Sequence, residues 1–157
     1  MHPRILSNKS KLDNLYTQVS SYTVPNEQVE WAKYLCVLTA GYIEESLRVL
    51  LLDFASKNSS IEIQRFVERE INFITNCKTE RIVSVLNKFD VTWAEKFAND
   101  IRDNSPIDRE IKDSIDSIVS NRHLIAHGKS VGLSYATVNS YYGYCSKAIE
   151  ILEDTIK

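Results

Sequence analysis

The fold of this chain is decided by residues 26–57, which read NEQVEWAKYLCVLTAGYIEESLRVLLLDFASK. Apolar side chains recur there at spacings of three, four and seven residues, and further apolar residues fill much of the remaining circumference. A helix that is apolar on most sides has to be covered by neighbouring elements. We therefore expect a long central helix that ends near Lys57, with Asn26 as its N-cap.

Shorter helical patterns on both sides of this segment predict the elements that cover it. They span residues 8–22, 59–74, 82–89, 92–102, 105–127 and 134–157. Thr92 to Glu95 reads as a capping box, Asp108 as an acid near a positive helix end, and Ser134 as the cap of the last helix. Only four Gly and three Pro are present, too few for the many turns of a sandwich or barrel. The pattern predicts an all-α bundle of about five to seven helices.

The bulk composition bounds the function. A length of 157 residues and 43% hydrophobic content predict one globular domain over residues 1–157. A formal charge of −2 argues against a protein that coats DNA through bulk positive charge, although a local nucleic-acid site is compatible with it. The three cysteines form no C-x-x-C pair, so neither a disulfide framework nor a thiolate zinc site is indicated, and a reducing cytosol fits best.

No segment indicates export or membrane insertion. The N-terminus lacks the apolar core of a secretion signal. The longest candidate for a membrane span, residues 34–43, stops at Glu44 and falls short of the ~20 apolar residues required. We expect a soluble, cytoplasmic protein.

The candidate chemistry is concentrated in residues 120–129, which read SNRHLIAHGK. Gly128 is typical of a helix C-terminus and places Arg122, His123 and His127 at the end of an apolar, helix-patterned segment. A guanidinium can stabilise charge on phosphoryl oxygens, and an imidazole can transfer a proton, so the pattern suits a phosphodiester substrate. Lys129 adds a positive charge with no acid nearby in sequence.

Two other interpretations of this segment compete. His123 and His127 are four residues apart and would share one helix face, as zinc ligands do, but Leu124 stands where a zinc-protease helix has Glu, and no third His or Cys is near. Alternatively, Arg122 pairs with an acid on a neighbouring helix and His127 caps carbonyls at the helix end.

Asn121-Arg122-His123-Leu124-Ile125-Ala126-His127-Gly128, late in an all-helical chain, resembles the Arg-x4-His motif of HEPN domains, and its closest branch is RiboL-PSP-HEPN. Residues 41–44, Gly-Tyr-Ile-Glu, resemble the glutamate-bearing core helix of that family.

The resemblance implies a homodimer in which two Arg-x4-His motifs form one RNA-cleaving cleft that needs no metal or other cofactor. His127 would be the general base or acid at the ribose 2′-OH, and Arg122 would hold the scissile phosphate, giving a 2′,3′-cyclic phosphate. Glu44 would orient Arg122 or His127, whereas the local alternative is an ion pair with Arg48. Asn121 belongs to the motif as a supporting residue.

Two positions depart from the family pattern. His123 stands where the family often has Asn, so it orients the phosphate or adds a second proton-transfer group. Lys129 stands where family toxins that are modified by a nucleotidyltransferase antitoxin have Tyr, which argues against that antitoxin. Tyr135, Tyr141, Tyr142 and Tyr144 either stack bases or make core and dimer contacts.

Three functions remain open. The first is a metal-independent endoribonuclease acting as a toxin or in antiphage defence, with RNA as substrate and an antitoxin or defence-system protein as a further partner. The second is a non-catalytic HEPN-like module that binds RNA, a nucleotide or a protein. The third is a purely structural helical dimer.

Overall fold

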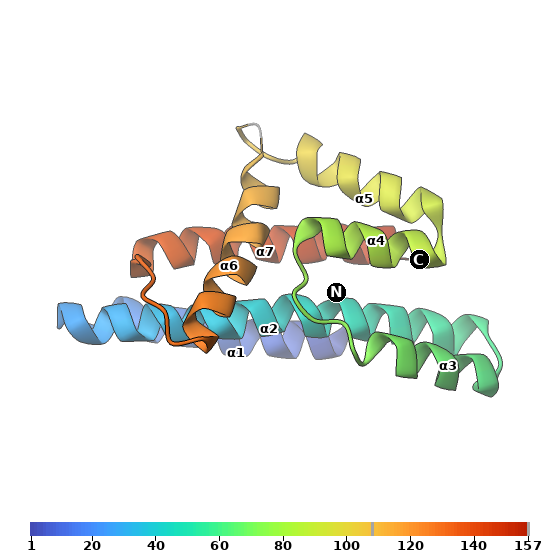
Figure 1. Cartoon of the computed structure of the whole chain (residues 1–157), viewed down its shortest axis with the longest axis horizontal. Coiled ribbons are helices and arrows are strands. Elements are labelled where there is room, and N and C mark those ends of the chain that lie inside the picture. Colours follow the sequence, from blue (N-terminus) through green and yellow to red (C-terminus); the bar gives the residue numbers. More distant parts are fainter. Residues whose placement is uncertain (108, 157) are drawn as a thin grey trace.

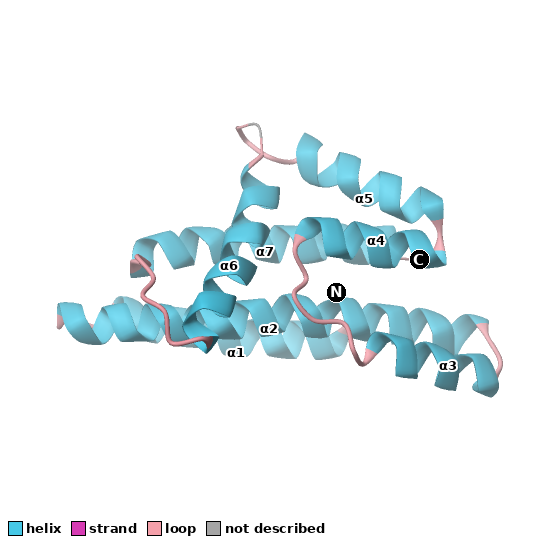
Figure 2. Cartoon of the chain, viewed as in Figure 1, coloured by secondary structure: helices cyan, strands magenta, loops and turns pink. Residues whose placement is uncertain are grey.

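The computed structural model describes residues 1–107 and 109–156. In this part of the chain it contains seven α-helices and no strand (Figures 1 and 2). The helices are α1 (Pro3–Ser20), α2 (Pro25–Asn58), α3 (Ile61–Ile71), α4 (Thr79–Phe89), α5 (Val91–Asp103), α6 (Glu110–Ala126) and α7 (Tyr135–Thr155). The predicted all-α bundle is confirmed, with a helix number at the upper end of the expected range.

The long helix α2 is the centre of the bundle. It packs against α1, α3, α6 and α7, and Figure 1 shows α6 crossing it steeply while α1 and α7 run along it. Four of its large side chains are almost completely buried: Leu35, Ile43, Leu47 and Leu51. The apolar circumference of α2 is therefore explained by the number of helices that cover it.

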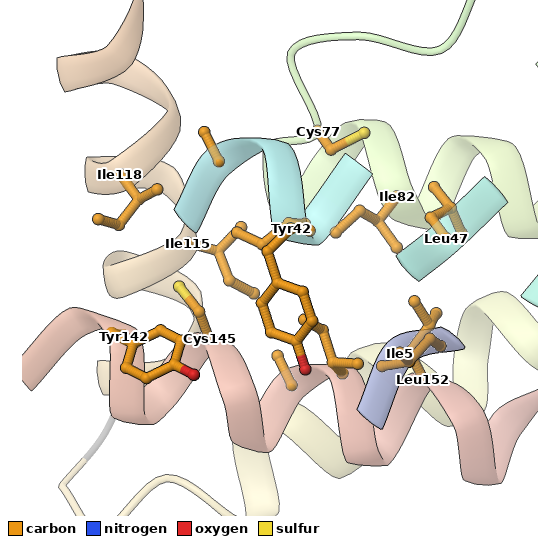
Figure 3. Close-up of a cluster of buried hydrophobic side chains, with 14 of the residues drawn as sticks. Ile5, Tyr42, Leu47, Cys77, Ile82, Ile115, Ile118, Tyr142, Cys145 and Leu152 are labelled. Carbon is orange, nitrogen blue, oxygen red and sulfur yellow. The ribbon is translucent and has the colours of Figure 1, made fainter. Parts of the chain in front are cut away.

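The core joins residues that are far apart in sequence. Figure 3 shows the Tyr42 ring of α2 among Ile115 of α6 and side chains of α7, with Cys77 entering the cluster from the loop just before α4. Ile115 and Cys77 are fully buried, and Tyr42 is 3% exposed. The end of the loop before α4 is thus anchored in the core.

The tyrosines of α7 mainly make contacts inside the bundle. The Tyr142 ring stacks on Tyr16 with centroids 4.3 Å apart, and its hydroxyl donates to Asp13 at 2.6 Å. The hydroxyl of Tyr135 donates to the backbone carbonyl of Tyr16, and that of Tyr144 to Glu110. These contacts favour the core interpretation of the tyrosines over base stacking.

Two predicted caps are wrong. Pro25 occupies the first turn of α2, and because its fixed φ suits that position, the helix starts before Asn26 and Val24 is the capping residue. At α5 the cap is Asp90, whose carboxylate accepts from the backbone N–H and the hydroxyl of Thr92. A carboxylate two residues earlier has displaced Thr92 from the cap.

Several helix boundaries differ from the sequence pattern. α1 begins at Pro3, five residues before the predicted start. α3 ends at Ile71, before the predicted end at residue 74. Its apolar side chains are largely open to solvent, with Ile63 and Phe66 more than half exposed, because α3 packs chiefly on α2. α6 begins at Glu110 rather than near Pro106, and the predicted helix-end acid Asp108 lies outside the described residues.

No helix in residues 1–107 and 109–156 combines the length and the apolar composition needed to cross a bilayer.

Two glycines are expected to respond in opposite ways to alanine. Gly41 lies inside α2, is exposed, and a Cβ built on it meets nothing within 4 Å, so Gly41→Ala should stabilise the fold by about 0.5–1 kcal/mol. Gly128 has a φ of +68°, so Gly128→Ala should destabilise it by about 1 kcal/mol. Urea unfolding measures the free energy of unfolding of both variants. A change in the same direction for both would contradict the prediction.

Candidate active site at the end of α6

The end of α6 is closed by a Schellman motif. The Lys129 N–H donates to the carbonyl of Leu124 at 2.9 Å, and the Gly128 N–H donates to that of Ile125 at 3.0 Å. Gly128 supplies the left-handed conformation that this motif needs. His127 is the C-cap residue, and its side chain is exposed. The sequence prediction that Gly128 ends the helix directly after His127 is confirmed.

Arg122, on the last turns of α6, is held by a carboxylate of α2. Its Nη2 lies 2.8 Å from Glu44 Oε1 and 3.3 Å from Asn76 Oδ1. The side chains of Arg122 and Glu44 are 25% and 13% exposed, so the pair is half-buried. Of the two sequence interpretations of Glu44, the structure therefore shows the contact with Arg122, while Arg48 pairs with Glu45.

Only one nitrogen of the Arg122 guanidinium is engaged by these contacts. Both hydrogen bonds use Nη2, and within the described residues no partner is assigned to Nη1 or Nε. A guanidinium presents five N–H donors in a planar fork. The anchored Arg122 therefore keeps donors for an additional anion.

The third member of this arrangement, Asn76, lies in the loop between α3 and α4. Its backbone N–H donates to the same Glu44 Oε1 at 2.9 Å. Its φ is +54°, the left-handed region in which Asn is the best tolerated residue after Gly. Glu44 thus binds both Arg122 and the loop, and the side-chain oxygen of Asn76 accepts a further hydrogen bond from Arg122.

Further contacts fix the same loop on both sides of Asn76. Arg48 Nη2 donates to the Ile74 carbonyl at 2.8 Å, and the Thr79 N–H donates to Asp116 Oδ1 of α6 at 2.8 Å. Ile74 and Cys77 are buried. The loop is therefore a fixed part of the site.

The Cys77 thiol lies beside this arrangement. Its burial, and next the negative charge of Glu44, raise the pKa of the thiol to about 12, so it stays protonated and is a poor nucleophile. Arg48, Arg81 and Arg122 are near enough to oppose this rise in pKa.

His123 and His127 lie on one face of α6, as their spacing predicts. Their ring centroids are 4.4 Å apart and the rings are tilted by 59°. Across the described residues, no group of three His, Cys, Asp or Glu side chains is placed to hold a metal ion. Of the other predicted supporting residues, Asn121 donates to the Ser117 carbonyl, and Lys129 is exposed.

A hollow of about 400 Å³ lies beside the Arg122 anchor, between α6 and the α3–α4 loop. We call it the α6 hollow, and it is lined by Asn76, Lys78, Val119, Ser120, His123 and Leu124. It therefore shares Asn76 with the Arg122 contact and His123 with the histidine pair.

Asp116 makes the attachment of the loop to α6 dependent on pH. Burial tends to raise its pKa, but the hydrogen bonds from Lys112 and the Thr79 N–H prevail and lower it below 3.8. The carboxylate therefore contributes stability above pH 3.8, and that stability is lost as the pH falls through the lowered value.

Asp116→Asn should accordingly cost about 1–2 kcal/mol at pH 7 and much less near pH 2. Urea unfolding at the two pH values measures the difference. A loss that is the same at both would contradict the role of the charge.

The sequence matches one known protein family. The family model described as RiboL-PSP-HEPN matches residues 4–157, nearly the whole chain. The chain belongs to the RiboL-PSP-HEPN family. No curated protein and no solved structure shows significant similarity to it.

In this RiboL-PSP-HEPN protein the structure brings together Glu44, Arg122 and Asn76 in direct contact, with His123 beside His127. The sequence analysis missed Asn76, which follows the helical pattern predicted for residues 59–74. The available signal was an Asn just after that pattern, since Asn accepts the left-handed conformation and offers a hydrogen-bonding amide.

Proposed function

We propose that this protein is a metal-independent endoribonuclease with a composite site between two copies of the chain. The observation that carries the proposal is the anchoring of Arg122 by Glu44 and Asn76 through one nitrogen, with the exposed His127 one turn further along α6. Membership of the HEPN family supports RNA as the substrate.

In the proposed reaction Arg122 binds the scissile phosphate through the nitrogens that Glu44 and Asn76 leave free. One His127 takes the proton of the ribose 2′-OH while the 2′-oxygen forms a bond to phosphorus. The bond from phosphorus to the 5′-oxygen breaks, and His127 of the partner subunit donates a proton to that oxygen. The products are a 2′,3′-cyclic phosphate and a 5′-hydroxyl, and Arg122 stabilises the negative charge of the transition state.

A second copy is part of the proposal because the resemblance to HEPN domains implies a cleft formed by two Arg-x4-His motifs. The positions of Arg122 and His127 at one exposed helix end are compatible with two such ends facing each other across a twofold axis. Size-exclusion chromatography with light scattering should therefore give a mass near twice 18.0 kDa.

The direct test is incubation of the purified protein with total RNA in EDTA, followed by mapping of the product ends. Cyclic-phosphate ends support the nuclease, and reduced growth on expression would support a toxin or defence role. RNA binding without cleavage by a dimer, over several RNA classes, would instead indicate the non-catalytic binding module.

A further inference from the structure

The α6 hollow is a site that the proposed reaction does not use. Its lining combines the apolar Val119 and Leu124 of α6 with polar side chains of α6 and the α3–α4 loop. Its volume of about 400 Å³ falls in the range of small-ligand pockets.

The polar groups around the hollow have hydrogen-bonding capacity to spare. Within the described residues no partner is assigned to the Asn76 amide nitrogen, the Lys78 ammonium, the Ser120 hydroxyl or the ring nitrogens of His123. Each of these groups can donate a hydrogen bond, and Lys78 can do nothing else. The lining therefore matches a ligand rich in acceptor oxygens.

The charge of Lys78 favours an anionic ligand among those rich in acceptor oxygens. The two carboxylates that accept hydrogen bonds from the Asn76 and Thr79 backbone are already paired, Glu44 with Arg122 and Asp116 with Lys112. Lys78 has no ion-pair partner in the described part of the chain, so its charge is available to an anion. A cation beside apolar side chains suits a nucleotide, whose phosphate carries negative charge and whose base or ribose can cover the apolar side chains.

We infer that the α6 hollow binds one nucleotide of the RNA next to the scissile phosphate, with Lys78 on its phosphate and the sugar or base against Leu124. This rests on the proposed function for the position of the nucleotide in the substrate. The shared Asn76 supports it, since its oxygen contacts Arg122 while its amide nitrogen is left for the neighbouring nucleotide.

RNA binding tests the inference without depending on cleavage. In the His127→Ala background, a labelled ten-nucleotide single-stranded RNA is titrated by fluorescence anisotropy at several salt concentrations. Lys78→Ala should raise Kd on the order of tenfold and reduce the slope of log Kd against log salt by about 0.7. Lys88→Ala removes an exposed lysine of α4, the helix that Lys78 directly precedes; it is the matched control and should leave Kd unchanged.

A second variant separates the hollow from general electrostatics. Ser120→Leu keeps all charges but fills the hollow, so it should weaken RNA binding while thermal unfolding shows an intact fold. The His123 imidazole signals in NMR should shift on titration with 5′-AMP. They should shift less with inorganic phosphate, which lacks the sugar and base, and less with adenosine, which lacks the phosphate.

The outcomes distinguish the two proposals. If wild type cuts no RNA but both hollow variants lose binding, the nucleotide site stands and the nuclease fails. If wild type cuts RNA while Lys78→Ala and Ser120→Leu bind it normally and AMP leaves the His123 signals unmoved, the nucleotide site is overturned. Equal weakening by Lys78→Ala and Lys88→Ala also overturns it, because bulk charge then explains the binding.

Discussion

Replacement of His127 by alanine is expected to lower metal-independent RNA cleavage by about 10²–10⁴-fold, the usual contribution of a general acid or base. The side chain is exposed at the C-cap of α6, and no hydrogen bond of the Schellman motif uses its imidazole. The fold should therefore be unchanged. Cleavage of a labelled RNA in EDTA measures the rate, and thermal unfolding and light scattering check the fold and the mass.

The control removes a histidine elsewhere. His2→Ala deletes the side-chain cap of α1, far along the chain from the motif, and should retain full cleavage. A His127→Ala protein that cuts as fast as wild type would exclude His127 from catalysis. The same loss of cleavage in both variants would show that the effect is not specific to His127.

Replacement of Glu44 by alanine is expected to destabilise the fold by about 2–4 kcal/mol. The change removes the acceptor for both Arg122 Nη2 and the Asn76 N–H, and leaves a half-buried guanidinium without its ion pair. Tm should fall by roughly 4–16 °C for a chain of this size. RNA cleavage should fall as well, because Arg122 and the loop lose their common anchor.

The neighbouring Glu45 gives a matched control. It pairs with the exposed Arg4 and with Arg48, and its side chain is twice as exposed as that of Glu44, so Glu45→Ala should cost less than about 1 kcal/mol. Glu44→Gln keeps an oxygen for both donors and should recover part of the stability. Equal losses in Glu44→Ala and Glu45→Ala would show that the Arg122 contact is worth no more than a surface ion pair.

The helices were predictable because their signals are local. Apolar spacing located α2 almost to the residue, and Ser134 and Gly128 marked helix ends through hydrogen bonds to residues within four positions. The misplaced caps at Asn26 and Thr92 arose where two local signals competed, namely Pro25 and Asp90. Which of two capping arrangements forms depends on small differences in free energy, and these cannot be obtained from the residue pattern alone.

The candidate site was predictable only in part, since its contacts span long distances in sequence. Arg122 and His127 share one helix end, and this was visible in the motif. The partner of Glu44 was not visible in the sequence. Local spacing favours Arg48, one helical turn away, whereas the observed partner Arg122 is 78 residues away. Arg48 is drawn instead to Glu45 and to the Ile74 carbonyl.

The sequence by itself determined the helical periods, the end of α6 and the presence of an Arg-x4-His motif there. Only the tertiary structure decided that Glu44 and Asn76 hold Arg122, and that Lys78 and His123 face one hollow. The physical reason is that periodicity fixes the direction of a side chain relative to its own helix. Its partner is fixed by how the helices and the α3–α4 loop pack together, which depends on the whole core.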